Sequence, residues 1–136
     1  NRKQISIALF EDTIKPAWED EKNQGGGYYS FMIYDRNAID TIWKRLLLRL
    51  IGHSLIPSDL TDKLTINGLL IRVRPNNVFE IQIWIRNNPM ISQDTHQKFI
   101  EYVKNDIKEV SDYNFPNNRS EQQFPPIYRR HDRGKK

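Results

Sequence analysis

The sequence predicts an α+β domain in which a curved antiparallel sheet carries its helices on one convex face and leaves the concave face open to a ligand. Segments with apolar residues at every second position indicate half-buried strands, and segments with apolar residues three and four positions apart indicate amphipathic helices. Their order along the chain is strand, strand, helix, hairpin, helix. Because an antiparallel sheet tolerates one solvated face, we expect the binding site opposite the helices.

The first two strands are expected over 4–10 and 28–34, because Ile5, Ile7 and Leu9 alternate with less apolar residues and an aromatic run follows three glycines. The loop between these strands contains Pro16 and a run of acids. Its composition makes it a candidate binding loop rather than a simple connection.

A helix is predicted over 39–51, where one wide stripe collects the apolar residues Ile39, Ile42, Trp43, Leu46, Leu47, Leu50 and Ile51. We expect Asn37 to cap its start and Gly52 to end it. Trp43 lies on the stripe and is assigned to the core. The opposite side carries Leu48 among the cations Lys44, Arg45 and Arg49. Leu48 is either a partner contact or an ordinary exposed leucine.

A hairpin follows, with strands over 65–74 and 78–86 joined by Pro75, Asn76 and Asn77. Strand alternation places Arg74 and Trp84 on the polar face of the hairpin, away from the isoleucines of the second strand. A tryptophan on the polar face is unexpected, because a core tryptophan would point to the opposite face of the strand, together with the isoleucines.

A second helix is expected to begin at Ser92, and a short strand to follow at 113–116. We divide the chain into one domain over residues 1–116 and a loop with a basic tail over 117–136. The net charge is +4, and five cations crowd the last eight residues, namely Arg129, Arg130, Arg133, Lys135 and Lys136. Without this tail the chain is close to neutral, so we expect specificity from a local site rather than from bulk attraction to nucleic acid.

The composition limits the environment of the protein. The 136 residues, 38% of them hydrophobic and 28% charged, suit one folded domain. No stretch approaches the roughly 20 apolar residues that cross a bilayer, so we expect no membrane partner. With no cysteine and no signal-like start, a cytoplasmic or nuclear location is expected.

Three blocks of the sequence carry a family resemblance. They are Phe10 with the run Lys15–Asn23 and Gly26–Gly27, the helix segment Ile42–Gly52, and the hairpin segments Asn67–Arg74 and Ile83–Trp84. In order and spacing they resemble the eukaryotic translation initiation factor 4E family. The chain begins without methionine inside an alternating segment, so we expect it to be a trimmed piece covering the C-terminal two-thirds of the family fold.

The resemblance implies binding of the 7-methylguanosine cap of messenger RNA. Methylation makes guanine cationic, so its ring would stack on the indole of Trp18, while Glu19 would accept the ring N–H and the exocyclic amine. The resemblance further implies that the Trp18 backbone N–H donates to the guanine oxygen, that Trp84 touches the methyl group and that Arg74 holds a phosphate. On the outer helix face, at Leu48, Lys44 and Arg45, it implies a scaffold initiation factor or a 4E-binding peptide.

The sequence departs from the family pattern in four ways. The upstream tryptophan that completes the family's stacking sandwich has no counterpart here, and Tyr28 and Tyr29 stand where the family has a basic residue and tryptophan. Glu80 replaces a phosphate-binding lysine, which leaves Arg72, Arg86 or the tail as substitutes. Lys44 and Arg45 replace a leucine and an acid. Half of the stacking sandwich is therefore missing, phosphate affinity is expected to suffer, and the usual scaffold peptide is less firmly expected than the cap.

Other interpretations remain open at this stage. Glu19, Asp20 and Glu21 could hold a metal in an enzyme, but the histidines are scattered and no nucleophile stands beside a base, so we expect no catalysis, no metal and no cofactor. A translational repressor, or a relative that kept the fold and lost the pocket, is an alternative. Individually, Trp18 could anchor the loop and Arg74 could pair with Glu80.

Overall fold

A computed structural model describes residues 6–17, 19–116 and 123–131 of the chain. The strands are β1 (Ser6–Phe10), β2 (Gly27–Ile33), β3 (Ile66–Arg74), β4 (Val78–Ile85) and β5 (Ile127–Arg130), and the helices are α1 (Ile39–Ile51) and α2 (Gln93–Ser111). Two short 3₁₀ turns, η1 (Ser58–Leu60) and η2 (Pro75–Asn77), complete the set. The strands form one antiparallel sheet in the order β1-β3-β4-β2-β5.

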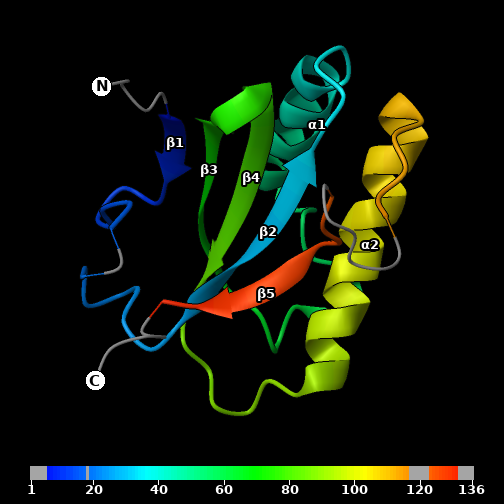
Figure 1. Cartoon of the computed structure of the whole chain (residues 1–136). Helices are drawn as coiled ribbons and strands as arrows, with labels where there is room; N and C mark the ends of the chain where they lie inside the picture. Colours follow the sequence, from blue (N-terminus) through cyan, green and yellow to red (C-terminus); the bar gives the residue numbers. More distant parts are fainter. Residues whose placement is uncertain (1–5, 18, 117–122, 132–136) are drawn as a thin grey trace.

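Both helices lie against the same face of this sheet (Figure 1). The core between the layers comes from alternate residues of β2, β3 and β4 and from the apolar stripes of the helices, and includes Phe31, Leu46, Ile83 and Phe99. The predicted α+β class, with an open, curved antiparallel sheet and helices on one side, is confirmed. Trp43, which we assigned to the core, is half-buried and packs against it.

The helix ends are set in two different ways. Ser92 caps α2 as predicted, since its hydroxyl accepts the Thr95 N–H at 3.1 Å. The prediction that Asn37 caps α1 is wrong, because Ala38 occupies that position and no side chain caps the helix. Asn37 instead lies in a turn where its N–H donates to the Asp35 carboxylate at 2.9 Å. Gly52 ends α1 as expected.

A buried acid joins the two helices. Asp106 of α2 accepts two hydrogen bonds from the Arg49 guanidinium, at 3.0 and 2.9 Å, and lies 3.5 Å from Nε of Arg45. Asp106 is 5% exposed, so this bidentate contact is shielded from solvent. It raises the pKa of Arg49 through the Asp106 hydrogen bond, and it connects α1 to α2.

The last strand corrects the expectation of a loop after residue 116. Ile127–Arg130 pairs with β2 along the edge of the sheet, and the His131 N–H continues the contact to the Gly26 carbonyl at 3.0 Å. The short strand expected at 113–116 is absent there. Tyr113 instead holds that segment through its hydroxyl, which accepts the Tyr34 N–H at 3.0 Å and donates to the Met32 carbonyl at 3.3 Å. The proposed domain boundary stays a prediction, and the other tail cations lie outside the described residues.

In the part of the chain that the structure describes, no helix has the length and apolar character needed to cross a bilayer.

Candidate functional site

The sheet face opposite the helices carries the polar and aromatic residues singled out in the sequence. The register places Trp84 of β4 directly opposite Tyr28 of β2 on one side and Gly68 of β3 on the other. Directly paired residues of an antiparallel sheet point to the same face. The predicted parity is therefore observed, and Arg74 and Trp84 lie on one face.

Arg74 and Trp84 nevertheless lie at opposite ends of the hairpin. Trp84 pairs with Gly68 and Arg74 pairs with Val78, so six residues of β3, or about 20 Å, separate them along the strand. A single ligand that touches both must be extended along the sheet.

The indole of Trp84 is enclosed rather than open to water. Its exposed fraction is 7%, and its ring centroid lies 5.2 Å from Phe10, 6.1 Å from Tyr28 and 4.1 Å from His131. The ring N–H donates to the Gln82 side chain at 2.7 Å. The sequence predicted that the sheet face around Trp84 is exposed to solvent. That prediction is wrong here, because β1 and the residue after β5 bring rings over it.

Glu80 is the charged centre of this face. It is 2% exposed and accepts hydrogen bonds from Ser30 at 2.6 Å, Arg72 at 3.0 Å and Arg74 at 3.2 Å. Burial by itself raises the pKa of Glu80, but the Ser30 and Gln82 hydrogen bonds and the Arg72 charge outweigh it and hold the pKa below its usual range. The pairing of Arg74 with Glu80, left open from the sequence, is thus present.

The loop between β1 and β2 is ordered by its own acids and amides. The Asp20 carboxylate accepts the backbone N–H groups of Lys15 at 3.0 Å and Lys22 at 2.9 Å. These two hydrogen bonds lower the pKa of Asp20. The Asn23 side chain, 0% exposed, donates to the carbonyls of Lys15 and Ala17 at 2.8 Å each. Asp20 therefore has a structural role.

A contact with the sheet holds this loop in place. The Asn67 side chain of β3 donates to the Lys22 carbonyl at 2.9 Å and to the Asn23 amide oxygen at 2.8 Å. Arg86 in turn donates to the Asn67 side-chain oxygen at 3.2 Å. The loop is thereby attached to the hairpin that carries Trp84 and Arg74.

Glu19 projects from this ordered loop into solvent. Its side chain is exposed, and its carboxylate makes no hydrogen bond or ion pair within the described residues, while its backbone carbonyl accepts from Gln24 at 3.0 Å. It lines an open hollow of about 420 Å³ with residues of the same loop, namely Thr13, Lys15, Ala17, Asp20, Glu21 and Lys22. Trp18 lies outside the described residues, so its assigned role stays a prediction.

A second hollow, of about 390 Å³, lies on the concave face of the sheet. Its lining comes from β2, β3, β5 and the segment before β5, and comprises Ser30, Met32, Arg74, Phe124, Pro125, Ile127 and Arg129. It is the more enclosed of the two and combines apolar walls with two arginines. No sequence argument had assigned it.

The outer face of α1 differs from its sequence-based description. Leu48 is 69% exposed, and Ile51, assigned to the apolar stripe, is 65% exposed one turn along. Lys44 pairs with Asp40 at 3.1 Å, and Arg45 approaches Asp106. The expected ring of free positive charge around Leu48 is therefore reduced, because all three of its members, Lys44, Arg45 and Arg49, have acidic neighbours.

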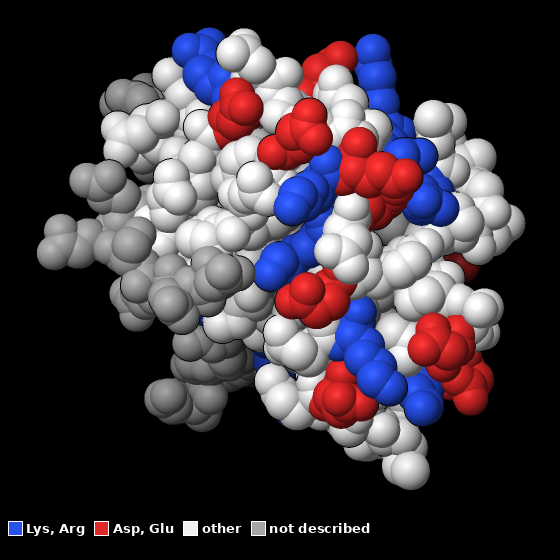
Figure 2. Space-filling view, turned by 90° about the vertical axis from the view of Figure 1, so that its right-hand side faces the viewer, with Lys and Arg blue, Asp and Glu red and all other residues white. Residues whose placement is uncertain are grey.

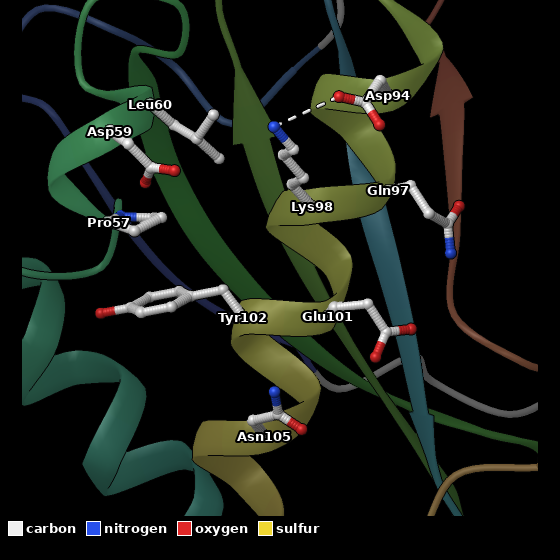
Figure 3. A pocket seen from close by; sticks show the side chains of 9 residues that line it. All are labelled: Pro57, Asp59, Leu60, Asp94, Gln97, Lys98, Glu101, Tyr102 and Asn105. Atoms are coloured by element: carbon white, nitrogen blue, oxygen red, sulfur yellow. Dashed lines mark ion pairs between the residues drawn. The ribbon is translucent and has the colours of Figure 1, made fainter.

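The helix-bearing side has a mixed charge pattern and a hollow of its own. Figure 2 shows cations and acids interspersed there rather than gathered in a field of one sign. A hollow of about 400 Å³ lies between η1 and α2, with Leu60 and Tyr102 beside several acids, and Asp94 is already paired with Lys98 at 3.3 Å (Figure 3). Over the described residues, no three potential ligands of the His, Cys, Asp or Glu type converge on a metal position.

Comparison with known proteins decides the family. The model of the family described as Eukaryotic initiation factor 4E matches residues 2–135. The chain belongs to the eukaryotic initiation factor 4E family. The match includes the segment of β5, which our sequence reading had assigned to a loop and tail.

Individual members of the initiation factor 4E family are similar to this chain in sequence and fold. The Eukaryotic translation initiation factor 4E of Eremothecium gossypii is 42% identical over 80 residues, which are 58% of this chain and 36% of that protein. The chain thus spans little more than a third of the length of the relative it matches.

Two solved structures share the fold. Ascaris suum eIF4E-3 with an m2,2,7G cap has a TM-score of 0.69 and 23% identity, covering 95% of this chain and 63% of that one. C. elegans eIF4E-3 with the 4E-binding protein Mextli has a TM-score of 0.68 and 21% identity, covering 93% and 64%.

Sequence reasoning missed the residues that position the loop of this 4E family member. Asn23, Asn67 and Asp20 make its internal contacts, and Arg129 reaches the concave face from β5. A signal for Asn67 existed, because a buried strand position seldom holds an asparagine without a partner. Asn23 and Asp20 offered only the turn-forming tendency common to such residues.

Proposed function

We propose that this chain binds the 7-methylguanosine cap of messenger RNA in translation initiation. The observation that carries the proposal is the family match over residues 2–135. The fold it shares with the Ascaris suum eIF4E-3 complex, whose ligand is an m2,2,7G cap, supports the same function. The ordered loop between β1 and β2, which carries the exposed carboxylate of Glu19, supports the assignment of the site to this loop.

In this proposal the loop recognises the base. Trp18 stacks on the cationic ring, and Glu19 accepts its N–H and amine donors in a two-point contact. The hydrogen bonds of Asp20 and Asn23 hold the loop backbone before the ligand arrives, which lowers the entropy lost on binding. The Glu19 carboxylate is supported as the acceptor because no described residue occupies it.

On the sheet, neighbouring side chains restrict the contacts that the family pattern assigns to Trp84 and Arg74. Trp84 is nine-tenths buried under Phe10, Tyr28 and His131, so a contact with the methyl group there requires one of these rings to move aside. Arg74 shares its charge between Glu80 and the phosphate. We expect base recognition to contribute more to affinity than the phosphates do.

We also propose a protein partner on the outer face of α1, with the whole assembly acting in the cytoplasm. The C. elegans relative binds the 4E-binding protein Mextli. Here Leu48 and Ile51 offer an exposed apolar pair one turn apart, beside Lys44 and Arg45. This arrangement suits an amphipathic helix that presents apolar anchors.

Affinity chromatography tests the central proposal. The full-length protein should be retained on 7-methyl-GTP resin, be eluted by free 7-methyl-GTP and remain bound when GTP is applied. Elution by both nucleotides would indicate general nucleotide binding. Failure to bind a resin that retains a known 4E protein would contradict cap binding.

A further inference from the structure

The hollow between η1 and α2 combines apolar surface, an aromatic ring and carboxylates. We propose that it is a docking site for an arginine presented by a protein partner, with the guanidinium between the ring of Tyr102 and the carboxylate of Asp59. The hollow lies on the helix-bearing side of the molecule, and neither Glu19 nor Leu48 lines it. It is therefore separate from the cap-binding loop and from the partner surface on α1.

The two walls of the hollow come from different elements. One wall is η1 with the residue before it, and the other is the exposed side of α2 (Figure 3). Its volume of about 400 Å³ lies at the lower end of the range for small-ligand sites. The space therefore suits one large side chain inserted by a partner.

The ring of Tyr102 is held in a fixed position. Its hydroxyl donates to the Ser54 carbonyl at 2.9 Å, and Figure 3 shows the ring extending from α2 towards Pro57. Pro57 and Leu60 add apolar surface to the lining. A planar guanidinium stacks on an aromatic ring, whereas the ammonium of lysine is a strongly hydrated point charge. The lining therefore favours arginine over lysine.

The charges of the lining favour a cation. Three lining residues are acids and one is a cation, in a chain whose net charge is +4. Lys98 pairs with Asp94 and Lys104 pairs with Glu101, each at 3.3 Å, so both pairs lie within α2. Asp59, on the opposite wall, is exposed and makes no hydrogen bond or ion pair with any residue that the structure describes. Its carboxylate is thus the available acceptor for an incoming guanidinium.

The same charges select the class of partner. Carboxylates facing a binding space repel the phosphates of a nucleic acid, and at an interface they favour a partner of opposite charge. A basic segment of a protein supplies both the cation and the methylenes that cover the apolar part of the lining.

Both walls are in place before a partner binds. The Leu60 N–H donates to the Pro57 carbonyl at 2.9 Å, and the Thr61 hydroxyl donates to the Ser58 carbonyl at 3.1 Å, which orders the turn that carries Asp59. Leu60 is 3% exposed and anchors this turn in the core. The opposite wall is a helix of 19 residues. A preformed site keeps more of its contact energy as affinity.

Peptide titration of the full-length protein tests the docking site. The probes are blocked alanine peptides with a single central arginine, lysine or glutamate, and binding is followed by backbone amide NMR shifts. The arginine peptide should shift the amides of η1 and of the facing side of α2 and bind with a dissociation constant of about 1 mM. The lysine peptide should bind more weakly, and the glutamate peptide should cause no saturable shift.

Variants of the two walls identify the contacts. Asp59→Asn and Tyr102→Leu should each weaken the arginine peptide about threefold, and the double variant about tenfold. Tyr102→Phe keeps the ring and should retain most of the affinity. Asp62→Asn is the matched control, because Asp62 is an exposed acid close to Asp59 in the chain that does not line the hollow. Melting temperatures report on the fold.

The outcomes separate this docking site from cap binding. Weakening by Asp59→Asn but not by Asp62→Asn, with 7-methyl-GTP affinity unchanged in both, supports the docking site. Equal weakening by the two variants would assign the effect to general charge and overturn the inference, as would an arginine peptide that binds the double variant as well as the wild type. Self-association that Asp59→Asn abolishes would make a second copy of this chain the occupant and overturn the assignment to a separate partner.

Discussion

Two glutamates in the loop between β1 and β2 make a controlled comparison at the residue scale. Glu19 and Glu21 are both exposed and line the same hollow. We assign only Glu19 to the guanine edge, so Glu19→Ala should weaken binding of 7-methyl-GTP by about 2 to 4 kcal/mol, since two donors lose their partner in a partly desolvated site. Glu21→Ala should change it little. Fluorescence titration checks both, and equal losses would refute the assignment.

Glu80 predicts a pH dependence of stability. Its hydrogen bonds hold the folded-state pKa below the ordinary value of 4.5. A carboxylate with a depressed pKa stabilises the fold above its unfolded pKa, and this contribution is lost as the pH falls through the lowered value. The difference in unfolding free energy between the wild type and Glu80→Gln should therefore be constant near neutral pH and shrink below about pH 4.5.

Urea unfolding at a series of pH values measures this difference. The Glu80→Gln variant is nearly isosteric and keeps an acceptor for Ser30, so its fold should persist. A difference that grows as the solution is acidified would mean that the pKa of Glu80 is raised, and that burial outweighs its hydrogen bonds.

Single residues also show where sequence reasoning stops. The parity of Trp84 and Arg74 followed from strand alternation, because adjacent residues must face opposite sides. The enclosure of Trp84 did not follow, since it depends on Phe10 and His131, which are 74 and 47 positions away in the chain. Local patterns contain no information about such contacts.

At the scale of elements, helix α1 separates partner binding from cap binding. Leu48 points away from the sheet with 69% exposure, so Leu48→Glu should abolish binding of a 4E-binding peptide and leave both the melting temperature and 7-methyl-GTP affinity unchanged. Met90→Glu is the matched control, because Met90 is an equally apolar residue at 83% exposure outside the helix.

Calorimetry with a peptide that has acids around its apolar anchor, and with a standard scaffold peptide, measures this effect. The remaining positive charge of Lys44 and its neighbours should favour the acidic peptide, although their pairing with Asp40 and Asp106 makes that preference smaller than the sequence alone indicated. Binding that survives Leu48→Glu would place the docking surface elsewhere.

Strong periodicity made most elements predictable. Helix α1 and the hairpin were placed within one or two residues, since 13 and 17 residues of consistent pattern outweigh local exceptions. β5 was missed because it has four residues and follows a stretch rich in Pro and Gln. A strand that short is specified by its partner β2 rather than by its own sequence.

At the scale of the whole molecule, the loop between β1 and β2 and the concave face of the sheet each carry one hollow. The loop with Glu19 is attached to the hairpin by Asn67, and the hollow with Arg129 is formed where β5 joins β2. The α+β class and the family were accessible from the sequence. How the charges of Glu80, Arg74 and Arg129 are arranged and paired could be determined only from the three-dimensional structure.

The most direct test of the account is the dependence of methyl recognition on Trp18. Calorimetric titration of the full-length wild type and of Trp18→Leu with 7-methyl-GTP and GTP gives two affinity ratios. The account predicts that the wild type prefers the methylated nucleotide by at least about tenfold and that Trp18→Leu, still folded by circular dichroism, loses this preference. A wild type that binds both nucleotides equally, or a preference that persists in Trp18→Leu, would contradict it.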